Sequence, residues 1–267
     1  MGTPRVACII PVRNRRQMVL AAIDSALNQS RRPDEIIVID DGSRDGTSEA
    51  ISKKFPDIIL LKGGGMGPGR ARNLGASVAT SDVFMFLDSD DLWLPNHVET
   101  LLAPLCRGGH CSFGVTLNIG LNDSFTIPGD EFGCKLSIFS NLLRWCCLVP
   151  SSFAITRETF VHSGGFPSIS LGEDWLFFVN LAVKFDLYFV PEIVTHLRLH
   201  GENLCWSTFS KKRAMDICEK LIQTALDNDM QEERKNLFQM KRLIAKEGEK
   251  WKSVQDWYLS LKKNGLI

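Results

Sequence analysis

The apolar run at 83–87 and the four residues after it constrain the fold of this chain most strongly. Five apolar residues, V-F-M-F-L, lead directly into Asp-Ser-Asp-Asp at 88–91. A short apolar run bounded by polar residues is typical of a strand buried on both faces of a parallel sheet. An ionised carboxylate is very costly in an apolar interior, so these side chains open into a polar site or meet a cation.

The spacing of the acidic residues indicates a metal site. Asp88 and Asp90 are two residues apart and point the same way on an extended chain. Paired hard oxygens suit Mg²⁺ or Mn²⁺ when the ion also holds substrate phosphates. The alternative is a plain strand end followed by the cap of a helix that begins near Pro95.

Three further apolar runs precede this one and alternate with segments of helical periodicity. We expect strands at 6–10, 35–39 and 58–61, and helices at 17–29, 47–51 and 70–79, with Thr47 as an N-cap. This alternation predicts a parallel, doubly wound sheet. Polar residues follow several of the strands, which is the layout of a nucleotide site at a sheet edge. Turn chemistry explains any one of these strand ends equally well.

Composition sets the class of protein. The 267 residues fit one large α/β domain or one domain with an extension, and the formal net charge is zero, which gives no argument for nucleic-acid binding. Residues 1–210 carry 18 basic and 22 acidic side chains, whereas residues 211–267 carry 13 and 9. The eight cysteines include no C-x-x-C pair. No secretory signal or transmembrane run is recognisable, so we expect a cytoplasmic protein with reduced thiols.

The glycine-rich segment at 63–69 excludes two nucleotide-binding classes. No Lys-Ser or Lys-Thr follows it, and its glycines miss the G-x-G-x-x-G spacing. We therefore reject a Walker-type ATPase and an NAD enzyme of the usual type. Arg70, Arg72 and Asn73 then open a helix, where cations and free N–H groups can face an anion.

Six blocks in this order resemble those of a family 2 glycosyltransferase of the GT-A fold. They are P-V-R-N at 11–14, D-D-G-S-x-D-G-T at 40–47, G-x-G-x-A-R-N-x-G at 67–75, D-S-D-D at 88–91, G-E-D-W at 172–175 and R-L-H-G-E-N at 198–203. The resemblance implies a Rossmann-like, mostly parallel sheet flanked by helices. It places a nucleotide-sugar half at 1–104, an acceptor half at 105–210 and a C-terminal helical extension at 211–267.

The resemblance also implies roles for residues in these blocks. The donor nucleotide sugar would be bound by Pro11, Arg13, Asn14, Asp41, Arg72, Asp88 and Ser89. Mn²⁺ or Mg²⁺ would be held by Asp90 and His200. Asp174 would be the catalytic base, and Glu173 and Trp175 would contact the acceptor or the sugar.

Three of these assignments have alternatives. Asp174 could be a helix N-terminal charge stabilised by the dipole, although two adjacent carboxylates raise each other's proton affinity as a base requires. His200 could contact the diphosphate or simply pack near the site. Trp175 could form a platform for a sugar face or belong to the core.

The implied activity is an inverting transfer of a sugar from a nucleoside-diphosphate donor, with UDP favoured. The acceptor hydroxyl would belong to a polysaccharide, a glycolipid or a glycopeptide. A non-catalytic sugar-nucleotide-binding scaffold is the alternative, and a nucleotidyltransferase is a third class. The apolar stripes of 211–267 predict helices that pack on the catalytic domain or on a second subunit, or a basic surface that docks on an anionic membrane.

Overall fold

The computed structural model describes residues 2–119, 126–127, 142–143, 146, 148–169, 172–200, 211–248, 260 and 263–264. Its strands are β1 (Val6–Val12), β2 (Glu35–Asp40), β3 (Ile59–Lys62), β4 (Val83–Phe86), β5 (Leu92–Trp93), β6 (Cys111–Ile119), β7 (Thr126–Ile127), β8 (Phe153–Thr156) and β9 (Leu187–Arg198). Its helices are α1 (Arg16–Leu27), α2 (Thr47–Lys54), α3 (Pro68–Val78), α4 (His97–Cys106), the short η2 (Pro150–Ser152), α6 (Arg157–Ser163), α7 (Glu173–Lys184), α9 (Lys211–Asp227) and α10 (Gln231–Glu247).

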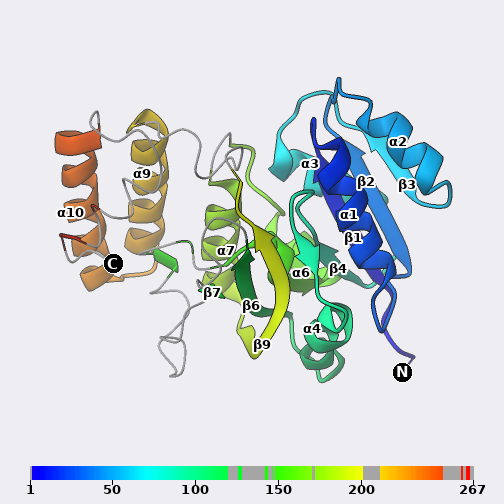
Figure 1. The fold of residues 1–267 in the computed structure, drawn as a ribbon. Helices are drawn as coiled ribbons and strands as arrows, with labels where there is room; N and C mark the ends of the chain where they lie inside the picture. The colour runs from blue at the N-terminus through cyan, green and yellow to red at the C-terminus, as the bar shows by residue number, and fades with distance from the viewer. Residues whose placement is uncertain are drawn as a thin grey trace.

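One sheet runs through the molecule in the order β3-β2-β1-β4-β8-β6-β9-β5, with β7 paired to β6 (Figure 1). Strands β1 to β4 are parallel to one another, as the alternation of strands and helices predicts. Beyond β4 the sheet is mixed, because β8 lies antiparallel between β4 and β6 while β9 runs parallel to β6. The parallel arrangement therefore holds for the N-terminal half of the sheet.

The sheet is buried on both faces, and alternate residues of β1 show how. Ala7 and Ile9 belong to a core shared with α3, α6, α7, α9 and α10. Val6, Cys8 and Ile10 belong to a second core shared with α1, α2 and α4. Successive side chains of a strand point to opposite faces, so the continuous apolar run gives a central strand covered by helices on each side.

The turn before α2 corrects one expectation about capping. Thr47 is the first residue of the helix, and Gly46 precedes it with a φ of 78°. The carboxylate of Asp45 accepts the Thr47 N–H at 3.1 Å and the Thr47 hydroxyl at 2.5 Å. Asp45 therefore provides the oxygen that we assigned to Thr47, because the left-handed Gly46 turns the chain one residue earlier.

The described helices of the C-terminal extension pack on the preceding domain. Ile217 and Leu221 of α9 share a core with α7, and Leu237, Met240 and Ile244 of α10 join the same core. This is the first of the two packing arrangements expected from the apolar stripes. The third apolar stripe, at 251–261, lies outside the described residues except for residue 260, and residues 201–210 before α9 are also outside them. The domain division at 210/211 therefore stays a prediction.

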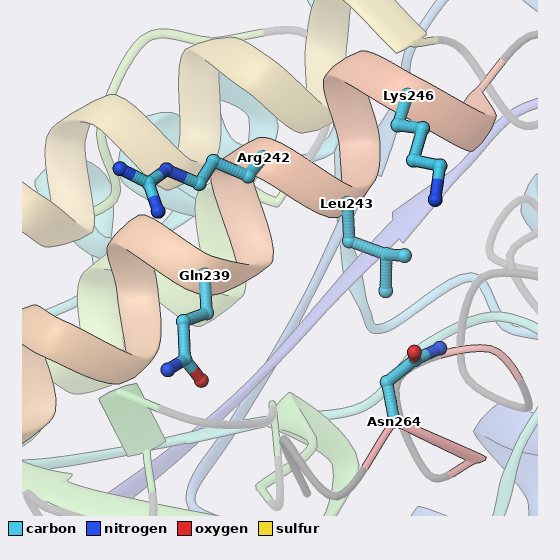
Figure 2. Close-up of a pocket in the computed structure, with 5 residues that line it drawn as sticks. All are labelled: Gln239, Arg242, Leu243, Lys246 and Asn264. Carbon is cyan, nitrogen blue, oxygen red and sulfur yellow. The ribbon is translucent and has the colours of Figure 1, made fainter.

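The exposed residues of α10 include the basic Lys235, Arg242 and Lys246 and the apolar Phe238. A surface hollow on this helix is lined by Gln239, Arg242, Leu243, Lys246 and Asn264 (Figure 2). Among the described helices, α10 included, none is both long and apolar enough to cross a membrane.

The last glycine of the 67–75 block explains how closely α3 approaches the sheet. A Cβ at Gly75 would lie 2.5 Å from Ile9 Cγ2 and 2.8 Å from Ile39 Cδ1. We predict that Gly75→Ala destabilises the protein by about 1–3 kcal/mol, because overpacking outweighs the gain in helix propensity of about 1 kcal/mol. Urea unfolding measures the difference. The exposed Ser77→Ala on the same helix serves as control, and a Gly75→Ala protein as stable as the wild type would contradict the close packing.

Candidate active site

The site lies where β1 and β4 separate at their carboxyl ends. The pairing of these two strands ends at Ile9 and Phe86. Val12 O accepts from Asp41 N at 2.8 Å, and Ile9 O accepts from Leu87 N at 3.0 Å. The backbone N–H and C=O groups of the odd-numbered residues of β1 therefore point toward β4. The backbone nitrogen of Pro11 therefore points toward β4, but the pairing with β4 ends before this residue. The missing N–H of Pro11 costs no hydrogen bond of the sheet. A crevice at this point of an open α/β sheet is the usual ligand site.

The acidic segment after β4 is a turn and not an extended strand. Asp91 N donates to Asp88 O at 2.9 Å. Asp88 and Asp90 consequently reach different cations, which corrects the expectation that they point the same way. Asp88 Oδ1 lies 2.5 Å from Arg72 Nη2, whereas Asp90 Oδ2 contacts Arg15 Nη1 and lies 3.2 Å from His200 Nε2.

Arg72 joins three of the sequence blocks in one buried cluster. The side chain, on α3, is 4% exposed, and its Nη1 lies 3.1 Å from Glu173 Oε1 at the start of α7. Its guanidinium also lies 5.1 Å from the ring centre of Phe166. Burial opposes the Arg72 charge, but Asp88 and Glu173 outweigh it, so the pKa of Arg72 lies above its ordinary value. The charge is thus permanent and fixes Asp88 and Glu173 in place.

Asp174 is one of two carboxylates of the site, with Asp91, whose pKa is raised. It lies in the first turn of α7, after Gly172 with a φ of 75°, and its Oδ1 accepts the Trp175 N–H at 2.7 Å. Desolvation, then the charge of Glu173, raises the pKa of Asp174 to about 7, against the opposing charge of Arg72. The helix-terminal charge and the predicted base are therefore the same group.

Asp41 holds the glycine-rich loop. Its two carboxylate oxygens accept the N–H groups of Gly65, Met66 and Gly67 at 2.7–2.8 Å. A carboxylate offers about four lone-pair directions, so roughly one is left for a ligand. The same loop leads into α3, whose Asn73 side chain bonds both the N–H and the C=O of Phe166, at 2.9 and 2.8 Å.

Asn14 fixes the neighbouring loop in a conformation that few residues adopt. Its φ is 53°, in the left-handed region. Its N–H donates to Ser43 Oγ at 2.9 Å, and its Oδ1 accepts from Arg44 N at 2.8 Å. Arg13 beside it is exposed and Pro11 is buried. The 11–14 and 40–47 blocks are therefore joined by the side chain of Asn14.

Side chains of Ser151 and Arg198 hold the acidic turn by hydrogen bonds. Ser151 Oγ accepts from Asp88 N at 3.0 Å and donates to Asp91 Oδ2 at 2.6 Å. Desolvation, followed by the charge of Asp88, raises the pKa of Asp91 to about 7. Arg198 Nε donates to Asp90 O, and its backbone N–H donates to Asp91 Oδ1 at 3.2 Å. Ser89 is also buried here, at 5% exposure.

The site residues come from segments that a known family shares. The family described as glycosyl transferase family 2 matches residues 7–161, more than half of the chain. The chain belongs to this family.

Two relatives and one solved structure extend the comparison. An uncharacterized glycosyltransferase of Rickettsia felis is 30% identical over 203 residues, which cover 74% of this chain and 33% of the relative. The Escherichia coli protein named UDP-Glc:alpha-D-GlcNAc-diphosphoundecaprenol beta-1,3-glucosyltransferase WfaP is 28% identical over 209 residues, covering 77% of this chain and 82% of that one. The match covers only about a third of the length of three of the Rickettsia relatives, those of R. felis, R. bellii and R. conorii.

The crystal structure of S. aureus TarS 1-349 in complex with UDP-GlcNAc matches with a TM-score of 0.69 and 18% identity, covering 87% of this chain and 69% of that chain. At this identity the likeness shows the fold, and the predicted GT-A α/β fold is confirmed. The family match stops before the blocks that contain Asp174 and His200. Their roles, like those of the other site residues, remain predictions.

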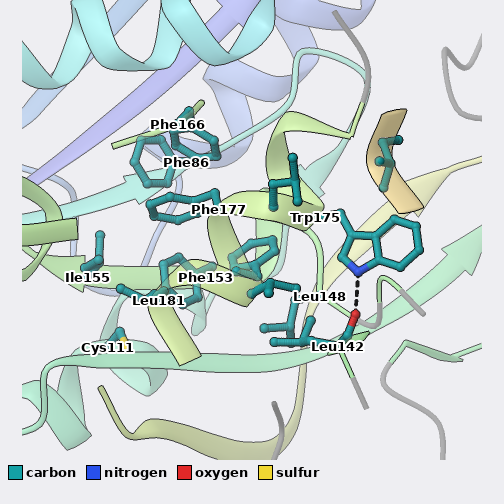
Figure 3. Packing of buried hydrophobic residues seen from close by; sticks show 14 of the residues in the cluster. Phe86, Cys111, Leu142, Leu148, Phe153, Ile155, Phe166, Trp175, Phe177 and Leu181 are labelled. Carbon is teal, nitrogen blue, oxygen red and sulfur yellow. Dashed lines mark hydrogen bonds between the residues drawn. The ribbon is translucent and has the colours of Figure 1, made fainter. Parts of the chain in front are cut away.

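The indole of Trp175, for which we expected a sugar or acceptor contact, lies in the core. Trp175 is 4% exposed, and its Nε1 donates to Leu142 O at 2.5 Å inside the core (Figure 3). A buried indole presents no face to a sugar, which favours the core alternative for Trp175. Glu173, at 7% exposure, is likewise committed to Arg72.

Sequence reasoning missed Arg15, Ser151 and Arg198. Arg15 stands in the polar run at 13–16, which gave no indication of a partner 75 residues away. Ser151 lies outside all six sequence blocks. Arg198 begins the last block, which was a signal that we used only for His200.

The proton affinity of Asp174 makes stability depend on pH. Between about pH 4 and pH 7 the folded protein holds a proton on this group that the unfolded chain has lost, because its folded pKa is about 7 against an ordinary 3.8. Its contribution to stability therefore falls as pH rises through this window. We predict that the melting temperature of Asp174→Asn, relative to that of the wild type, is higher at pH 8 than at pH 5. The increase should be about 2–4 °C for each kcal/mol of wild-type stability lost between the two pH values.

Differential scanning calorimetry at both pH values measures this gain. The exposed Asp57→Asn, which removes an equal charge, should shift the two melting temperatures alike. A melting-temperature difference between Asp174→Asn and the wild type that is the same at pH 5 and pH 8 would contradict the raised pKa.

Proposed function

We propose that this family 2 chain transfers a sugar from a nucleoside-diphosphate donor to an acceptor hydroxyl with inversion at the anomeric carbon. One observation carries the proposal. The buried Arg72 holds the turn of Asp88 and Asp90 against the start of α7, where Asp174 lies. Family membership, the UDP-glucose donor in the name of WfaP and the UDP-GlcNAc bound to TarS support a UDP-sugar.

In the proposed reaction, Asp174 accepts the proton of the acceptor hydroxyl. The hydroxyl oxygen then bonds to the anomeric carbon, and the bond from that carbon to the diphosphate oxygen breaks with its electron pair on the leaving nucleoside diphosphate. A base works best when its pKa lies near the working pH, and the raised pKa of Asp174, about 7, meets this condition. Asp41, with Pro11, Arg13 and Asn14 near it, is proposed for the nucleobase end of the donor.

Asp90 and His200 fit a divalent cation as a two-ligand site. Asp90 Oδ2 and His200 Nε2 lie 3.2 Å apart, and Mg²⁺ commonly takes one or two protein ligands with substrate phosphates completing the shell. The described residues contain no group of three or more His, Cys, Asp or Glu side chains placed to hold a metal. A bound Mn²⁺ or Mg²⁺ would neutralise the charge of the leaving diphosphate.

We predict that Asp174→Asn reduces transfer at least 100-fold while UDP affinity stays within about threefold, because removing the base spares the donor pocket. A coupled assay measures UDP release from UDP-glucose and UDP-GlcNAc with a lipid-linked or sugar acceptor. The exposed Asp57→Asn should retain wild-type transfer.

Near-wild-type turnover of Asp174→Asn would contradict the base assignment. UDP binding without any acceptor-dependent release by the wild type would favour the scaffold alternative. Release of pyrophosphate in place of nucleoside diphosphate would indicate a nucleotidyltransferase.

For the acceptor side we propose that the outer face of α10 docks on an anionic lipid surface. Lys235, Phe238, Arg242 and Lys246 lie three or four residues apart on one face of the helix, and Phe238 is 46% exposed. The apolar face of α10 is already used in the core, whereas Lys235, Arg242 and Lys246 are exposed. WfaP is named for a lipid-diphosphate acceptor, which would be reached from such a surface.

We predict that Arg242→Gln/Lys246→Gln weakens binding to vesicles of one-third phosphatidylglycerol by roughly tenfold or more, since each basic side chain contributes about 1 kcal/mol near an anionic surface. Co-sedimentation in low salt measures the affinity. The double variant Lys212→Gln/Lys220→Gln removes the same charge from exposed positions of α9 and should bind like the wild type. Equal loss in both variants, or no binding by the wild type, would contradict a docking face on α10.

A further inference from the structure

Arg15 occupies the place beside Asp90 where the proposed function puts a divalent cation. It precedes α1 on the loop after β1, and its Nη1 contacts Asp90 Oδ2. His200 Nε2 lies 3.2 Å from the same oxygen. The side chains of Arg15 and Asp90 are each 14% exposed, so their ion pair is largely removed from water.

The pairing has a clear electrostatic reason. A largely buried carboxylate is costly without an opposite charge. Asp88 obtains that charge from Arg72, whereas Asp90 obtains it from Arg15. A divalent cation bound to Asp90 Oδ2 would need the position of the Arg15 guanidinium and would repel its charge. Metal and guanidinium would therefore compete for Asp90 Oδ2.

The displaced guanidinium would have another partner close by. A donor diphosphate that shared a divalent cation with Asp90 would lie within reach of a side chain that already touches Asp90. The planar fork of arginine suits phosphate oxygens. A flexible side chain on the loop after β1 can make this change without moving the sheet.

We propose that Arg15 is a further donor-binding residue, which neutralises Asp90 in the metal-free protein and would contact the diphosphate once Asp90 holds a divalent cation. The inference rests on the proposed function and deepens it. Arg15 then weakens metal binding to the free protein and strengthens nucleotide binding once the metal is present. These two effects have opposite signs, which a purely structural role would not produce.

Isothermal titration of the full chain tests both effects. Mn²⁺ is titrated into the protein alone, and UDP is then titrated in saturating Mn²⁺. For Arg15→Gln we expect at least threefold tighter Mn²⁺ binding and about tenfold weaker UDP binding, the usual range for one charged contact to phosphate. Arg16→Gln removes the same charge one residue away at an exposed position and should leave both affinities within twofold. Arg15→Lys should recover part of the UDP affinity.

Weaker Mn²⁺ binding by Arg15→Gln, or unchanged UDP binding, would overturn the inference, with circular dichroism verifying the fold of the variant. Absence of Mn²⁺ binding by both wild type and Arg15→Gln would overturn it too, because there would be no competition. Sugar transfer in EDTA would in that case leave the proposed transferase function standing, so the two failures are distinguishable.

Discussion

The buried guanidinium of Arg72 is the interaction on which the rest of the site depends. It bonds Asp88 after β4 and Glu173 at the start of α7, from a position on α3. Removing one partner of a buried ion pair leaves an uncompensated charge and is strongly destabilising. The three segments therefore assemble together, and the same contact that completes the core sets the relative position of the acidic turn and Asp174.

The charges of the site are nearly all compensated within the protein. Asp41 is satisfied by backbone N–H groups, Asp88 by Arg72 and Asp90 by Arg15. Asp174 differs, because desolvation and Glu173 outweigh Arg72 and its pKa rises to about 7. The pKa of Asp91 also rises to about 7, but Asp91 is buried and bonded to the Ser151 hydroxyl and the Arg198 N–H, whereas Asp174 is only half-buried.

Much of this arrangement could be predicted from the sequence, and the limit has a physical cause. Strand periodicity and six ordered blocks located β1 to β4 and the acidic turn, because local pattern determines which face of an element is buried. The pattern says nothing about which partner a polar side chain meets across the sheet. Asp41 bonds a loop 24–26 residues away and Arg15 bonds Asp90 75 residues away, so these contacts emerged only from the fold.

A thermal-shift panel of UDP, dTDP, GDP and CDP, each with and without Mn²⁺, tests most directly whether the acidic turn belongs to a nucleotide-sugar site. A ligand at about 100 times its dissociation constant stabilises a fold by roughly 2.7 kcal/mol. The account predicts a shift for UDP that requires Mn²⁺ and disappears in Asp90→Ala. No shift with any of the four nucleotides, or a UDP shift that survives in Asp90→Ala, would contradict it.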